Sequence, residues 1–107
     1  MVGDIVLAPF PFADRSDDKL RPVAVLADVY ESGERDWIVC EITSSGIARS
    51  ATIALGSEDL ASGRVARLSV IRPNRLSTIN EARFGRVVAR LTQAKLDEVL
   101  TAVRSLF

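Results

Sequence analysis

Short apolar runs separated by turn residues fill the first two thirds of the chain, and this pattern predicts a series of β-strands. Residues 21–30 (RPVAVLADVY) form a continuous apolar, β-branched run, as expected for a strand buried on both faces. The polar stretch 31–36, which contains Gly33, reads as a turn before the next apolar run at residues 37–44 (WIVCEITS). Residues 21–44 are therefore predicted to form a hairpin.

Further strands are predicted on both sides of this hairpin. Residues 4–12 read as a strand that bends or lies at a sheet edge, because Pro9 and Pro11 cannot both donate to central ladders. Residues 56–64 are expected to form a loop with one helical turn. The other expected strands are residues 50–55, residues 65–73 up to Pro73, residues 75–79 after a kink, and residues 85–91.

The period of the apolar positions changes at the end of the chain. Within residues 92–107, apolar side chains recur at helical spacing and Thr92 is suited to be the N-cap. The apolar positions are Leu96, Val99, Leu100, Val103 and Leu106, and the polar side carries Asp97, Glu98 and Arg104. Five or six short strands and one terminal helix predict a mainly β fold, with the helix packed against a small curled sheet or barrel. No repeat or linker interrupts residues 1–107, so one domain is expected.

Composition removes several kinds of chemistry. The chain has no histidine, which excludes Ser-His and Cys-His catalytic pairs and makes a zinc site untenable beside a single cysteine. Cys40 lies in an apolar run and is interpreted as a small buried hydrophobe rather than a nucleophile. Fourteen basic residues balance fourteen acidic ones, so net charge does not attract nucleic acid or membrane. No membrane span or signal peptide is apparent, and a cytoplasmic location is expected.

Two strand ends carry side chains suited to an anionic ligand. Arg21 precedes Pro22, which biases it toward extended backbone and allows its guanidinium to be aimed at a phosphate. The alternative is a surface arginine paired with Asp17 or Asp18. Thr43 and the serines after it end the third apolar run, where hydroxyls either bind phosphate oxygens or close a turn.

A third group of polar residues surrounds Pro73. Arg72 and Arg75 flank Pro73-Asn74 at the expected break in a strand, and a curled sheet could bring them near the other two strand ends. Nearly all basic residues are arginines, the better bidentate phosphate ligand, although a high-GC genome produces the same bias.

The order of these segments resembles the MazF/PemK-like toxins of bacterial toxin–antitoxin systems. The features that carry the resemblance are GDIVLAPFPFAD, RPVAVLAD, a strand ending in ITSS, SVIRPNRLSTIN and a closing amphipathic helix. The resemblance implies an SH3-like small barrel of the MazF/PemK/CcdB type and a homodimer. It also implies a metal-independent, cofactor-free endoribonuclease that cuts single-stranded RNA, and a cognate antitoxin that covers the active groove.

The resemblance also assigns roles to individual residues. Arg21 matches the family's catalytic Arg-Pro arginine and Thr43 its strand-end hydroxyl, with Ser44 in support. Asn74 departs from relatives that carry an aspartate there, so Asp18 or Asp17 is the candidate base or orienting group. Arg72 matches a second arginine, a candidate general acid, and the expected substrate-binding residues are Ser44, Arg49, Arg72, Asn74 and Arg75.

Two rival functions remain open at this stage. A non-catalytic SH3-like module that binds a peptide or an antitoxin fits the loss of the aspartate at Asn74. A toxin directed at DNA gyrase is possible by analogy of fold alone.

Overall fold

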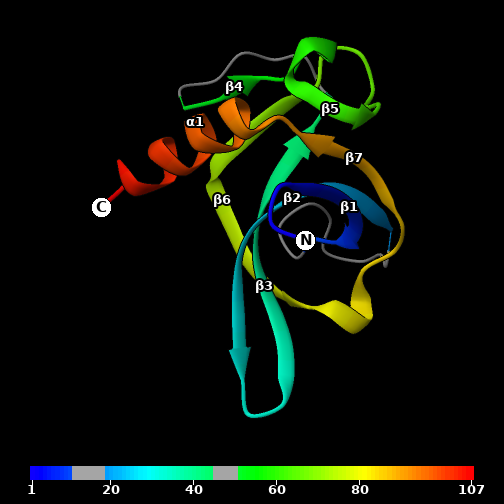
Figure 1. The fold of residues 1–107 in the computed structure, drawn as a ribbon, viewed down its shortest axis with the longest axis vertical. Helices are drawn as coiled ribbons and strands as arrows, with labels where there is room; N and C mark the ends of the chain where they lie inside the picture. Colours follow the sequence, from blue (N-terminus) through cyan, green and yellow to red (C-terminus); the bar gives the residue numbers. More distant parts are fainter. Residues whose placement is uncertain (11–18, 45–50) are drawn as a thin grey trace.

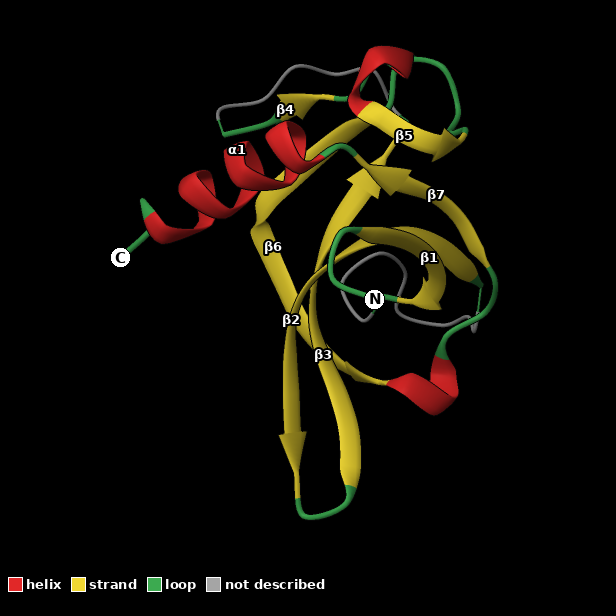
Figure 2. Ribbon diagram, in the orientation of Figure 1, coloured by secondary structure: helices red, strands yellow, loops and turns green. Residues whose placement is uncertain are grey.

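The computed structural model describes residues 1–10, 19–44 and 51–107. In this part of the chain, seven strands form one sheet in the order β4-β6-β3-β2-β1-β7-β5, and one α-helix closes the chain (Figure 1). The strands curl strongly around the N-terminal region, as Figure 2 shows, which gives the small barrel-like, mainly β fold that the sequence predicts. The strands are β1 (Asp4–Pro9), β2 (Leu20–Glu31), β3 (Glu34–Thr43), β4 (Ile53–Ala54), β5 (Leu60–Gly63), β6 (Val70–Asn80) and β7 (Val87–Leu91).

The predicted hairpin of residues 21–44 is present as β2 and β3. Glu31 pairs with Glu34, so Ser32 and Gly33 form a two-residue loop, and both have positive φ (52° and 81°) as a twisted hairpin turn requires. Residues 23–26 of β2 alternate between two apolar clusters, so this part of the strand is buried on both faces as predicted, whereas Asp28 and Tyr30 of the predicted strand are exposed. One cluster contains Val23, Val25 and Val39, and the other contains Ala24, Leu26, Cys40 and Ile42.

β6 is a single strand with a step in its pairing. Cys40 of β3 pairs with Leu76, whereas the next residue, Glu41, pairs with Arg72. The three residues between these partners are looped out of the ladder, and they include the buried Pro73, which has no N–H to donate. The predicted kink is confirmed, but the predicted start of this strand at residue 65 is wrong, because pairing begins only at Val70.

Of the two alternatives predicted for residues 4–12, an edge strand or a bend, the edge strand is excluded. β1 is not an edge strand, because it lies between β2 and β7. Pro9 is tolerated because β7 pairs with β1 only as far as Val6. The edges are β4 and β5 instead. β4 is only two residues long, and β5 lies where a loop was expected, after the predicted helical turn η1 (Ser57–Asp59).

The predicted helix is α1 (Gln93–Arg104), which packs against β6 and β7. Thr92 is its N-cap, and its Oγ1 accepts a hydrogen bond from the Lys95 amide at 3.1 Å. Leu96 and Val99 are the buried contacts, and the helix ends three residues before the almost fully exposed Phe107. Within the described residues no helix is long and apolar enough to cross a membrane.

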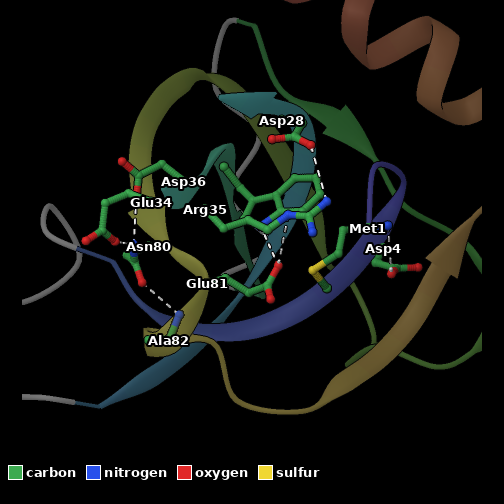
Figure 3. Close-up of polar contacts among 10 residues, drawn as sticks. Met1, Asp4, Asp28, Glu34, Arg35, Asp36, Asn80, Glu81 and Ala82 are labelled. Carbon is green, nitrogen blue, oxygen red and sulfur yellow. Dashed lines mark hydrogen bonds and ion pairs between the residues drawn. The ribbon is translucent and has the colours of Figure 1, made fainter. Parts of the chain in front are cut away.

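A short 3₁₀ turn, η2 (Glu81–Arg83), contacts the part of the β2–β3 hairpin nearer its loop, through Glu81. Figure 3 shows Arg35 between Asp28 and Glu81, at 3.6 and 3.8 Å. Trp37 Nε1 donates to Glu81 Oε1 at 2.9 Å, and the Arg35 guanidinium lies 5.5 Å from the Trp37 ring centroid. Two of the three carboxylates of β3, those of Glu34 and Asp36, lie near this end of the strand and away from the end at Thr43.

Candidate anion-binding site

The candidate site lies where three neighbouring strands bring polar side chains to one end of the sheet. Glu41 of β3 lies between Val23 of β2 and Arg72 of β6 in the pairing register. Residues two apart on a strand project from the same face. Arg21 and Thr43 therefore project to the same side as Glu41.

A pocket of about 710 Å³ opens at this place, a volume typical of ligand sites. The lining residues come from β1, β2, β3 and β6, from the segment that follows β5, and from β7 and the residue that precedes it. In Figure 1 the tip of β3 accordingly lies near β5 and β7. The polar lining consists of Arg21, Arg64, Arg72, Arg75, Arg86, Glu41, Thr43, Ser44 and Ser69.

The charge of this lining is strongly positive. The described lining residues include five guanidinium groups and one carboxylate. Arginine stays protonated at any physiological pH. A concave surface with walls of low dielectric constant concentrates such a potential. The local charge therefore favours an anionic ligand, although the net charge of the whole chain is zero.

One ion pair lies inside the pocket. Arg72 Nη1 donates to Glu41 Oε1 at 3.1 Å, and the two side chains are only 15% and 11% exposed. Arg72 Nε is buried and has no hydrogen-bond partner among the described residues. A buried donor without a partner is unfavourable for folding and calls for an explanation, such as a water, an ion or a ligand that binds there.

The comparison with protein families identifies one family. The sequence profile of the family described as "PemK-like, MazF-like toxin of type II toxin-antitoxin system" matches residues 1–107. The chain belongs to this family. Among curated proteins, none matches the sequence.

Solved structures share the fold of this MazF-like chain at low sequence identity. An endoribonuclease from a mycobacterial species superposes with a TM-score of 0.69 at 13% identity, covering 98% of this chain and 88% of its own. MazF from Deinococcus radiodurans superposes with a TM-score of 0.68 at 20% identity, covering 98% and 93%. The MazE–MazF complex from the same organism gives 0.67 at 18% identity, covering 98% and 91%.

The structure brings together most of the residues that the sequence singled out in this MazF-like chain. The pocket lining contains Arg21, Thr43, Ser44, Arg72 and Arg75. Asn74 is exposed on β6 and is not among the lining residues. Asp17, Asp18 and Arg49 lie outside the described residues.

Three charged lining residues were missed by the sequence reasoning. Arg64 and Arg86 each follow a glycine, Gly63 and Gly85, at points where the backbone passes close to neighbouring groups. A Gly-Arg pair beside a strand was the available signal. The signal for Glu41 was an acidic residue inside an otherwise apolar run, because a glutamate is rarely buried unless it is paired.

Cys40, on the strand that carries Glu41, is excluded as a nucleophile by its surroundings. Burial, then the charge of Glu41, raise the pKa of the Cys40 thiol to about 12, against a smaller opposing effect of a backbone hydrogen bond at Ala24. At pH 8 the thiolate fraction is therefore on the order of 10⁻⁴. We expect Ellman's reagent to label Cys40 at pH 8 only as fast as the protein opens, and at once in denaturant. Labelling of the native protein at the rate of a free thiol would contradict this burial.

Proposed function

We propose that this MazF-like chain is an endoribonuclease toxin that cuts single-stranded RNA without a metal ion or cofactor. The observation that carries the proposal is the pocket lined by five arginines and by Thr43. Membership of the family and the endoribonuclease among the similar structures support the same reaction class. In the proposed setting the toxin is a cytoplasmic homodimer that a cognate antitoxin neutralises, as the MazE–MazF complex suggests.

RNA supplies the nucleophile for the proposed reaction. The 2′-oxygen attacks the adjacent phosphorus, the bond from phosphorus to the 5′-oxygen breaks, and the products are a 2′,3′-cyclic phosphate and a 5′-hydroxyl. The protein has to accept the 2′-hydroxyl proton and stabilise the charge that develops on the phosphoryl oxygens. The 5′-oxygen takes its proton from Arg72, which water reprotonates, or from water directly.

The lining residues divide these tasks by position. Arg21 and Thr43 hold the scissile phosphate, with Ser44, the residue after Thr43, in support. Arg72 adds positive charge from β6. Arg75, and outside the described residues Arg49, extend the path of the RNA backbone. Asp17 and Asp18 stay candidate bases from the sequence, and Asn74 a candidate contact of the RNA.

The test is cleavage of a long single-stranded RNA by purified, antitoxin-free protein in EDTA. We expect cuts at a short recurring sequence, with 5′-hydroxyl ends that polynucleotide kinase labels without prior phosphatase treatment. No cut by folded protein, across RNAs of varied sequence, would reject the endoribonuclease. The exposed amide of Asn74 would then favour a binding module for a peptide or an antitoxin.

A further inference from the structure

Glu41 is the one carboxylate among the described residues that line the arginine-rich pocket. The residue is 8% exposed, and it lies in the middle of the sheet, between β2 and β6. Its neighbours along β3, Cys40 and Ile42, belong to the apolar core. A charged residue at this position therefore needs an explanation.

Stability does not provide that explanation. Burying a carboxylate and a guanidinium costs desolvation energy that their mutual attraction often fails to recover, and an apolar pair of similar volume is usually at least as stable. Glu41 and Arg72 make one hydrogen bond, and Arg72 Nε is left buried without a partner among the described residues. An aliphatic pair at these two positions would fill the core and leave no buried donor without a hydrogen-bond partner.

The position of Glu41 matches a chemical need of the proposed site. Glu41 lies two residues before Thr43 on the same face of β3, opposite Arg72, and next to the strand that carries Arg21. A phosphate held by these groups would bring its neighbouring ribose to the carboxylate. No other described residue of the pocket lining can accept a proton at neutral pH, since the remaining ionisable groups are the five arginines.

We propose that Glu41 is the general base of the reaction, an inference that rests on the proposed function. A carboxylate oxygen of Glu41 accepts the proton of the 2′-hydroxyl as the bond from the 2′-oxygen to phosphorus forms. The bond to the 5′-oxygen then breaks, and a proton from water completes the 5′-hydroxyl. After release of the cyclic phosphate, Glu41 returns its proton to solvent.

Arg72 orients this base through the 3.1 Å hydrogen bond to Oε1. A carboxylate has a second oxygen and further lone pairs with which to accept a proton. Among the residues that the structure describes, the other charged groups of the pocket lining are all arginines: Arg72 and Arg75 from β6, Arg21 from β2, and Arg64 and Arg86 from the segments next to β5 and β7.

The decisive variant is Glu41→Gln, which keeps the size of the side chain and an oxygen that accepts from Arg72. We expect its single-turnover cleavage rate to fall by about 10²–10⁴. Binding of a 2′-deoxy analogue of the RNA should be unchanged or tighter, because a negative charge leaves a phosphate pocket. The acid limb of the pH–rate profile, which reports protonation of an essential base, should disappear.

Two further variants separate a base from a structural residue. Glu41→Asp keeps the carboxylate but withdraws it by one methylene, so we expect a slower reaction that retains the acid limb. Glu31→Gln makes the same chemical change on an exposed residue of β2, and its rate, binding and Tm should match those of the wild type. The Tm of each variant shows that it is folded.

Each outcome decides the inference. Cleavage by Glu41→Gln at nearly the wild-type rate, with the acid limb intact, overturns the role of Glu41 and leaves the endoribonuclease standing. A parallel loss of rate, analogue binding and Tm makes Glu41 a structural residue and also overturns the role. Absence of cleavage by the wild-type protein overturns both proposals.

Discussion

Arg21→Ala is expected to lower the single-turnover rate of RNA cleavage by about 10²–10³, the usual effect of removing one donor that stabilises developing charge. Arg21 lines the pocket from the beginning of strand β2, and Pro22 restricts the backbone from which the arginine projects. The guanidinium is thus held in place before the substrate arrives. Arg21 is partly exposed and does not belong to either apolar core cluster, so the Tm should change little.

The controls separate charge, geometry and nonspecific attraction. Arg21→Lys keeps the charge but loses the planar fork, so we expect a partial loss of rate. Arg104→Ala removes an exposed arginine of α1 outside the pocket lining and should leave the rate unchanged. Wild-type cleavage by Arg21→Ala would show that the phosphate is held elsewhere in the molecule.

Gly63→Ala is expected to destabilise the fold by on the order of 3 kcal/mol, with a fall in Tm of roughly 10–20 °C. Gly63 has a φ of +75°, which L side chains rarely adopt. An added Cβ would also meet the Val88 carbonyl oxygen and come within 2.6 Å of Ala89 Cα, on the strand that β5 pairs with. Backbone strain and a steric clash therefore act together, and both are measurable by thermal or denaturant unfolding.

Gly33→Ala is the matched control for this effect. Gly33 has a similar φ of +81°, but nothing lies within 4 Å of an added Cβ at the tip of the hairpin. Only the backbone strain remains there, and we expect a cost of about 1 kcal/mol. Equal effects of the two substitutions would mean that β5 moves away from β7 without penalty.

The elements that the sequence predicted well are those whose pattern is local. The apolar spacing of α1 and its Thr92 cap lie within one segment, and so does the turn at Gly33 that closes the β2–β3 hairpin. Strand β5 was missed because its sequence, LASG, has no alternation and only one apolar side chain of any size. Its strand conformation comes from pairing with β7.

The candidate site was predictable only in part, for a related reason. Arg21 and Thr43 were identifiable because Arg21 begins one apolar run and Thr43 ends another, at points where side chains leave the core. Arg64 and Arg86 face the same pocket from connections far away in the chain, and no periodicity links those connections to β2 or β3. Their approach depends on how the sheet curls.

The sequence by itself determined the family, the terminal helix, the central hairpin and the absence of histidine chemistry, because each depends on local order or on composition. The tertiary structure decided which charges meet. If the pairing of Cys40 with Leu76 had continued unchanged, Glu41 would face Arg75, and the step in β6 places Arg72 there instead. Register between distant strands is set by the packing of both faces of a sheet at once. Only the folded molecule therefore joins Glu41 to Arg72.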